Sequence, residues 1–332
     1  MHKVRANEAG TTCDKYLHIS LLVNGTYLHF YRDLSYMRIL VIGASGLLGS
    51  NVITVSQDRD IDVVGTYHSS KPSFDIPLAK LELQDIKRFD EILDFYTPNA
   101  VINCAAMTDV DSCEKNPNQA YAVNCNAPGV LAEHCTKHNV KFVHVSSDYV
   151  FDGTAVTPYT EEASTNPVQV YGNSKLKSEE KVTAANREAL ITRLSFVYGI
   201  HGDTKELTGF PAWIYSRLKN DQPTPLFTNQ RVTPTRAGQA AETLIDLLIS
   251  KESGIYNVAC RSCVSPYEFG IKICNRLNTK NDLLSKGLQD DIDRSAARPS
   301  YTCLDVSKVE DSLDRLQPTL ETELNEIENA IF

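Results

Sequence analysis

The sequence predicts an α/β fold in which a doubly wound parallel sheet is joined to a smaller C-terminal lobe. Between residues 37 and 147, short apolar segments rich in β-branched residues alternate with helical segments five times. This alternation is typical of parallel strands joined by right-handed crossovers. The first strand runs into a glycine-rich turn, and small or hydroxyl-bearing residues stand where later strands should end. After Arg193 the alternation breaks down, which predicts a separate lobe stitched to the sheet.

Residues 1–36 do not fit this pattern. Leu17–Tyr31 places an Asn24-Gly25 turn between apolar flanks, which predicts a β-hairpin. Because the first core strand begins at Arg38, we expect Met37 to be the biological start. The upstream segment is then either an artefact or a loosely attached arm.

The stretch from residue 37 to residue 50 predicts a dinucleotide site. Arg38–Ile42 reads as a buried strand that runs into Gly-x-x-Gly-x-x-Gly, which opens a helix over Leu47–Gln57. A Cβ in this turn would hold the backbone away from a pyrophosphate, and the first helical turn points unpaired N–H groups at the anion. The spacing is a variant of the dinucleotide-binding (Rossmann) signature. The cofactor contacts expected here are Gly43, Ser45, Gly46, Leu47, Leu48 and Gly49.

The second strand, Ile61–Tyr67, predicts which dinucleotide is preferred. In an NAD-specific site, an acidic residue near the end of this strand bonds the ribose 2′-hydroxyl. The segment that follows Tyr67 carries no carboxylate, and its polar groups could bond a 2′-phosphate. We therefore expect NADP(H) to be preferred, with NAD(H) also able to bind. The contacts expected at this end are His68, Ser69 and Lys71.

The next two strands lead towards the same edge of the sheet. A third strand is predicted at Lys80–Leu83, followed by a helix that Asp85 caps and that runs to about Tyr96. A fourth strand at Ala100–Ala105 ends in small residues, so its backbone can lie close to a cofactor.

One long helix is predicted over Asn116–Asn139, and Lys141–Ser147 reads as the fifth strand. Asn124 in that helix could cross-link neighbouring segments through its amide, or make a polar contact without a special role. The further cofactor contacts expected from these elements are Leu83, Cys104, Ala105, Ala106 and Asn124.

Tyr171 and Lys175 form the predicted reactive pair. They are four residues apart in the helical segment Val170–Thr183 and so share one face. We expect the ammonium to lower the pKa of the phenol from about 10 towards neutrality. The phenol could then give a proton to a carbonyl oxygen while a hydride reaches the carbon, and Ser147 could orient the same oxygen. The expected catalytic residues are Ser147, Tyr171 and Lys175, of which the last two also contact the cofactor.

Together these motifs resemble an extended short-chain dehydrogenase/reductase and, more narrowly, the dTDP-4-dehydrorhamnose reductases. The resemblance spans residue 37 to the C-terminus. It is carried by Asn103–Asp111, Val145–Gly153, Pro167–Lys175, Arg193–Gly199, Asn229–Thr235 and Arg298-Pro299. It implies NAD(P)H-dependent reduction of a nucleotide-linked 4-keto-6-deoxysugar, as in dTDP-L-rhamnose biosynthesis. The residues expected at this nucleotide-sugar substrate are Thr108, Val110, Asp148, Phe196, Gln230, Arg231 and Arg298.

Three departures from the family pattern concern the substrate. Ser147 stands where threonine is usual, Phe196 stands where tryptophan is usual, and the loop His201–Phe210 is altered. Serine keeps the hydroxyl group, whereas the other two changes leave the identity of the sugar open.

The same blocks also resemble the regulatory β subunit of methionine adenosyltransferase. That subunit shares the reductase fold, binds NADP and acts by associating with a catalytic partner, which would then be the partner here. An epimerase or dehydratase of the same superfamily, using the same trio with bound NAD⁺, is a third interpretation. Because the trio is common to these three interpretations, the sequence leaves all of them open. It also leaves open whether the protein forms a homodimer.

The C-terminal part reads as a substrate lobe. Helices are predicted at Phe210–Lys219, Thr235–Ser250 and Pro266–Arg276, and a strand at Gly254–Val258. Arginine forks match phosphate oxygens, so the candidate diphosphate contacts are Arg231, Arg236 and Arg298. The predicted units are residues 1–36 as an extension, 37–193 as the Rossmann domain with the catalytic pair, and 194–332 as the main substrate lobe.

Composition excludes several classes of protein. Of the 332 residues, 42% are apolar and 23% are charged, so a large core can form. A net charge of −9 argues against nucleic-acid binding, and no apolar run is long enough to cross a bilayer. The nine cysteines lack a disulfide-framework spacing, so we expect reduced thiols in the cytoplasm. We expect no zinc or redox role for the close pair Cys260 and Cys263, and no metal site.

Overall fold

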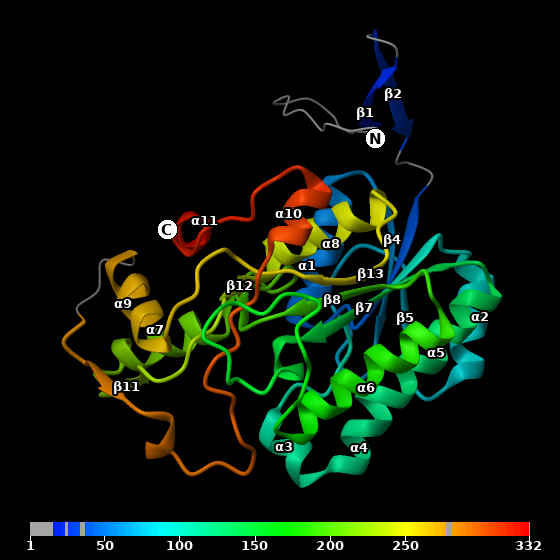
Figure 1. Ribbon diagram of the computed structural model, residues 1–332. Helices are drawn as coiled ribbons and strands as arrows, with labels where there is room; N and C mark the ends of the chain where they lie inside the picture. The colour runs from blue at the N-terminus through cyan, green and yellow to red at the C-terminus, as the bar shows by residue number, and fades with distance from the viewer. Residues whose placement is uncertain (1–15, 24–25, 34–36, 277–280, 332) are drawn as a thin grey trace.

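The computed structural model describes residues 16–23, 26–33, 37–276 and 281–331. Its centre is a seven-stranded sheet in the order β13-β8-β7-β6-β3-β4-β5, in which every neighbouring pair is parallel (Figure 1). The predicted fold class is therefore confirmed. The strands are β3 Arg38–Ile42, β4 Asp62–Tyr67, β5 Leu78–Lys80, β6 Ala100–Asn103, β7 Lys141–Ser147, β8 Leu190–Leu194 and β13 Gly254–Asn257.

Helices cover both faces of the sheet because successive strand residues point to opposite sides. Ile39 and Val41 of β3 belong to one core cluster, together with residues of α1 and α8. Leu40 and Ile42 belong to a second cluster, together with residues of α2, α5 and α6. These helices are α1 Leu47–Asp58, α8 Ala237–Ile249, α2 Ile86–Tyr96, α5 Ala127–Lys137 and α6 Val170–Ala185.

Two predicted elements of this half are wrong in detail. The third strand is β5 at Leu78–Lys80 and not 80–83, so residue 82 lies beyond the strand. The predicted long helix is continuous over α4 (Pro117–Tyr121), a π-helical turn (Ala122–Asn126) and α5, and only the π-helical turn departs from the expected regular helix. Asn124 lies in this turn, and its buried amide bonds a neighbouring loop. A short helix, α3 at Val110–Lys115, precedes them.

The C-terminal residues form a lobe with its own core, which includes Tyr198, Ile214, Leu226 and Phe269. The predicted helices at 210–219 and 266–276 are confirmed as α7 and α9, and α8 and β13 lie within one or two residues of their predicted bounds. The remaining elements are β9 Val197–Ile200, β10 Leu207–Thr208, α7 Phe210–Lys219, β11 Thr224–Phe227, β12 Thr235–Arg236, α9 Pro266–Arg276, β14 Leu284–Gly287, α10 Ser307–Leu313 and α11 Leu320–Ile331.

The predicted hairpin is present as β1 (Tyr16–Val23) and β2 (Thr26–Asp33), which pair antiparallel with each other. Its turn, Asn24-Gly25, lies outside the described residues. Whether the native chain begins at Met37 stays a prediction. Within the described ranges, no helix is both long enough and apolar enough to span a membrane.

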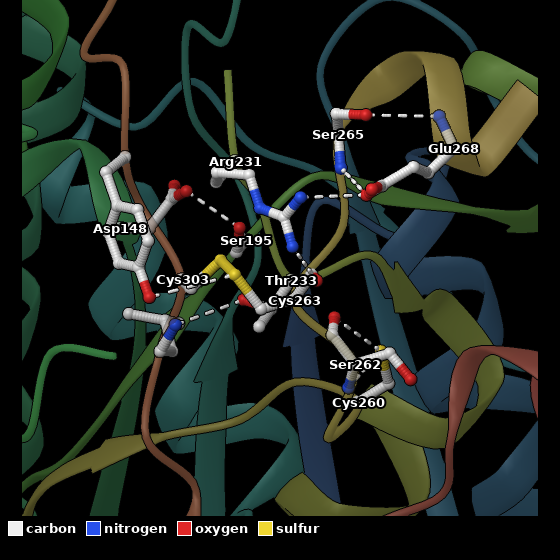
Figure 2. The surroundings of a disulfide bond; sticks show 12 residues. Asp148, Ser195, Arg231, Thr233, Cys260, Ser262, Cys263, Ser265, Glu268 and Cys303 are labelled. Carbon is white, nitrogen blue, oxygen red and sulfur yellow. Dashed lines mark hydrogen bonds and ion pairs between the residues drawn. A yellow bond between two sulfur atoms is a disulfide. The ribbon is translucent and has the colours of Figure 1, made fainter. Parts of the chain in front are cut away.

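The expectation of reduced thiols is wrong for one pair of cysteines. Cys263 and Cys303 form a disulfide, with their Cα atoms 5.6 Å apart (Figure 2). The two residues are 40 positions apart, and the bridges that align Val232 with Val264 and Arg231 with Tyr301 bring their segments together. Because long-range backbone pairing creates this contact, cysteine spacing could not predict it. Cytoplasmic location stays a prediction.

Candidate active site

A cavity of about 810 Å³ lies at the carboxyl ends of the central strands. Gly43, Ala105 and Ser147 line it from three neighbouring strands, β3, β6 and β7, where the sequence predicted a ligand. This edge is where open α/β sheets bind ligands, because the strands stop there and the helix N-termini face the opening. The described lining also includes the predicted cofactor residues Ser45, Gly46, Leu47, Leu48, Gly49, His68, Leu83, Cys104, Ala106, Tyr171 and Lys175.

The glycine-rich turn fits a pyrophosphate. Gly43 has φ +87°, and a Cβ there would lie 3.0 Å from the backbone nitrogen of Ala105. A Cβ on Gly49 would lie 2.2 Å from the carbonyl oxygen of Gly43, so only glycine lets α1 start this close to β3. Gly46 caps α1 without a side-chain hydrogen bond to the first-turn N–H groups. Those groups are left for an anion in the cavity.

The adenosine end of the cavity departs from the sequence prediction. His68 lines it, but Ser69 and Lys71 are exposed and are not among the lining residues. Glu82 does line it, with its carboxylate Oε2 2.7 Å from Nε2 of His68. Sequence reasoning named Leu83 of this segment as a cofactor contact but missed Glu82. The signal that could have found it is the parallel register of β4 and β5.

The predicted catalytic residues meet at the middle of the cavity. Ser147 ends β7, and Tyr171 and Lys175 face the same space from α6. The hydroxyl of Ser147 donates to Asp148 Oδ1 at 3.0 Å, and its oxygen faces the Tyr171 phenol. Lys175 is 2% exposed, and its Nζ donates to the carbonyl oxygen of Val145 at 2.5 Å. The ammonium therefore points into the protein, towards β7.

The expectation that Lys175 makes the Tyr171 phenol acidic is wrong. Burial raises the pKa of Tyr171 above its ordinary value, and only the interaction with Ser147 opposes the rise. Burial also lowers the pKa of Lys175, to about 8. The physical reason is that both groups lose hydration when charged, and Lys175 is not among the groups that shift the pKa of Tyr171. A phenol that keeps its proton is nevertheless the form required to protonate a carbonyl oxygen.

Close packing holds α6 against the end of β7. A Cβ on Gly172 would lie 2.0 Å from the carbonyl oxygen of Tyr149, so glycine is required beside Tyr171. Asn124 is fully buried and is not among the cavity's lining residues, in contrast to its predicted cofactor contact. Its side chain instead accepts from the N–H of Met107 at 2.7 Å and donates to Met107 oxygen at 2.9 Å. Asn124 thus fixes the loop after β6, which forms one wall of the cavity.

Asp148, predicted at the substrate, lines this cavity but is 3% exposed. Its carboxylate accepts from Ser147 at 3.0 Å and from the Ser195 hydroxyl at 2.7 Å. Burial raises the pKa of Asp148 to about 6. Thr108, Val110 and Phe196, which were also predicted at the substrate, line the cavity as well.

A second cavity, of about 590 Å³, adjoins the first, and Tyr149 and Phe196 line both. Phe196 has φ +46°, a strained conformation for a bulky residue, at the junction. Two predicted substrate residues, Gln230 and Arg298, line this second cavity. The other residues that matter here are Phe210, Trp213, Arg217, Phe227 and Arg294, which give it aromatic and cationic character.

Two arginines predicted as diphosphate contacts are turned elsewhere. Arg231 Nη1 donates to the Glu268 carboxylate at 2.9 Å and its Nη2 donates to the Cys263 carbonyl oxygen at 2.8 Å, as Figure 2 shows in part. Arg236 bonds Glu323 at 2.6 Å. Neither lines either cavity. Their guanidinium groups are already paired with acidic partners, which sequence spacing does not reveal.

Comparisons with known proteins agree with this geometry. Residues 37–331 match the family model described as the RmlD substrate binding domain. The probable low-salt glycan biosynthesis reductase Agl14 of Haloferax volcanii is 48% identical over 294 residues, which cover 89% of this chain and 98% of that protein. A dTDP-4-dehydrorhamnose reductase from Clostridium acetobutylicum has a crystal structure with a TM-score of 0.78 at 26% identity, covering 88% of this chain and 99% of that chain.

A further relative has a different role. The methionine adenosyltransferase 2 subunit beta of Rattus norvegicus is 28% identical over 279 residues, 82% of this chain and 81% of that protein. Both resemblances that the motifs indicated are therefore confirmed.

Proposed function

The chain belongs to the RmlD substrate binding domain family and is an oxidoreductase, and we propose that it reduces the keto group of a nucleotide-linked 4-keto-6-deoxysugar. The observation that carries the proposal is the convergence of Ser147, Tyr171 and Lys175 on one cavity with the glycine-rich turn. A proton donor and a dinucleotide site facing the same space are what carbonyl reduction requires.

We propose NADP(H) as the preferred cofactor. The uncapped start of α1 and the cradle formed by Gly43 and Gly49 fit its pyrophosphate. Leu81 and Leu83, both nearly buried, line the space for the adenine, and His68 can donate to a 2′-phosphate. When bound, the reduced cofactor supplies a hydride to the carbonyl carbon.

Side chains of the protein supply the proton that the carbonyl oxygen needs. Tyr171 keeps its proton because burial raises the pKa of the phenol, so it can protonate the carbonyl oxygen. Ser147 hydrogen-bonds Tyr171 and fixes the direction of its hydroxyl. Lys175 lies buried on the next turn of α6, where its ammonium stabilises the phenolate that remains after proton transfer. The ammonium can also hold a ribose hydroxyl of the cofactor.

The second cavity suits the nucleotide part of the substrate. Its aromatic residues Phe210 and Trp213 offer faces for a base, and Arg294 and Arg298 offer positive charge for a diphosphate. Arg298 already bonds Asp111 at 2.7 Å, which holds the guanidinium in place. We propose a dTDP-linked sugar, as in dTDP-L-rhamnose biosynthesis, as the first substrate to test.

The test is NADPH oxidation with a panel of nucleotide 4-ketosugars, dTDP-4-dehydrorhamnose first, followed by absorbance of the reduced cofactor. The native protein should oxidise NADPH, and Tyr171→Phe should lower turnover roughly 100-fold or more. NADPH binding by the variant, measured by calorimetry, should stay unchanged, which shows that the fold is intact. Full turnover by Tyr171→Phe, or no turnover of any sugar by the native protein, would refute the proposal.

A second candidate function is that of a cofactor-binding regulatory subunit. It is favoured by the 28% identity to the methionine adenosyltransferase 2 subunit beta over 82% of this chain. In that case no nucleotide sugar would consume NADPH, and the chain would instead bind and stimulate a methionine adenosyltransferase catalytic subunit. Tyr171→Phe would leave that stimulation unchanged. A bound NAD⁺ retained through purification would instead favour an epimerase or dehydratase.

A further inference from the structure

The parallel register of β4 and β5 places two polar residues side by side at the adenosine end of the first cavity. Tyr67 pairs with Lys80, and the N–H of Leu81 donates to the carbonyl oxygen of Tyr67 at 2.9 Å. His68 follows Tyr67 directly and Glu82 follows Leu81, so both residues lie just beyond the paired ends of β4 and β5. Leu81 and Leu83 are 4% and 9% exposed, so they anchor the segment and leave Glu82 in the opening.

His68 and Glu82 form the charged end of this cavity. Their side chains are 2.7 Å apart, and 68% and 53% exposed respectively. Among the described lining residues, the other groups that can carry charge are Lys175 and Asp148, which lie beside Ser147 at the reaction centre. The end of the second strand is where a dinucleotide fold reads the ribose 2′-position. An imidazole and a carboxylate therefore stand together where the two nicotinamide dinucleotides differ.

We infer that His68 and Glu82 act together as the cofactor selector, in which His68 favours the 2′-phosphate of NADPH and Glu82 limits that preference. This inference rests on the proposed use of NADP(H). With NADPH, the imidazole exchanges the carboxylate for the phosphate, and Glu82 is left facing a like charge. With NADH, the carboxylate can accept a hydrogen bond from the ribose 2′-hydroxyl. Glu82 thus takes the place of the carboxylate that the end of β4 lacks.

The test compares dissociation constants for NADPH and NADH by isothermal titration calorimetry, without sugar. Glu82→Gln should shift the affinity ratio roughly 3- to 10-fold towards NADPH, because a carboxylate this exposed is partly screened. His68→Ala should shift it in the opposite direction. Glu91→Gln is the matched control, because it changes the net charge equally but lies on the exposed face of α2. Raising the ionic strength should reduce the effect of Glu82→Gln.

The outcomes separate this inference from the proposed function. A ratio in Glu82→Gln equal to that in Glu91→Gln would overturn the inference and leave the proposed reduction standing. A changed ratio in a protein that reduces no sugar would support the selector and refute the proposed substrate. Failure of the native protein to bind either dinucleotide would refute both.

Discussion

At the scale of single residues, Asp148 is a buried carboxylate with a raised pKa. Hydrogen bonds limit the rise, and no cation contributes to it. Burial raises this pKa from 3.8 to about 6. The folded state therefore binds the proton more tightly than the unfolded chain, so the stability contributed by protonated Asp148 is present at low pH. It is lost as the pH rises from about 4 through about 6.

The substitution Asp148→Asn should remove this dependence. Relative to the native protein, the variant should gain up to about 3 kcal/mol in unfolding free energy between pH 4 and pH 8. The measurement is urea unfolding of both proteins at the two pH values. Any cost of altering the hydrogen bonds with Ser147 and Ser195 enters at both pH values and cancels in the comparison. An equal difference at both pH values would contradict the prediction.

Residue identity and spacing were enough to locate the trio. They were not enough for residues whose role depends on which side chains surround them in the folded chain. Ser147, Tyr171 and Lys175 could be placed from sequence because strand ends and helical spacing determine where they point. Arg231 could not, because its guanidinium is taken by Glu268, which is 37 positions away in sequence. The pKa of Tyr171 could not be predicted either, because burial, which dominates it, is a property of the folded chain.

At the scale of elements, the contact between α6 and the turn after β7 sets the position of Tyr171. Gly172→Ala would place a Cβ 2.0 Å from the carbonyl oxygen of Tyr149, and a backbone atom cannot move aside cheaply. We expect a loss of about 1–3 kcal/mol in unfolding free energy. We also expect kcat to fall while the dissociation constant for NADPH changes little, because Tyr171 moves away from Ser147.

The control for this prediction is Gly287→Ala in β14, where the nearest atom would lie at 3.4 Å, an ordinary contact. This variant should keep both stability and turnover. Denaturant unfolding and steady-state kinetics measure the two effects. Full turnover in Gly172→Ala would show that α6 can shift without disturbing the site.

Element boundaries were predictable where the chain's own pattern determines them. Asp85 caps α2 through a hydrogen bond from the N–H of Arg88, as the sequence indicated. The π-helical turn at Ala122–Asn126 was not predicted; it carries Asn124, whose amide bonds the backbone of Met107. The bounds of β5 were not predicted, and Glu82, which lies two residues beyond its end, lines the first cavity although the sequence did not indicate it.

At the scale of the whole molecule, the sheet and the C-terminal lobe have separate cores, and the proposed substrate would contact both. Alternation of strands and helices predicted the sheet, because each crossover unit is local in sequence. For the lobe, the sequence predicted individual helices and one strand but not how they pack together. Its assembly depends on pairings such as β11 with β14, whose residues are 60 positions apart.

The disulfide links this long-range assembly to substrate binding. It joins Cys263 to Cys303 and closes a segment that includes Arg294 and Arg298 of the second cavity. A crosslink across 40 positions restricts the unfolded chain and stabilises the fold by roughly 2–4 kcal/mol. The segment lies apart from the glycine-rich turn and the trio in sequence, so its loosening should affect the nucleotide-sugar site first.

We therefore expect dithiothreitol to lower the unfolding free energy by roughly 2–4 kcal/mol. It should also raise KM for the nucleotide sugar while leaving the dissociation constant for NADPH unchanged. The double variant Cys263→Ser, Cys303→Ser should match the reduced native protein and should not respond to dithiothreitol, which separates the crosslink from the six other cysteines in the described part of the chain. Equal stability of native and double-variant proteins would mean that backbone pairing alone, through the bridges at Arg231 and Val232, holds this wall of the substrate site in place.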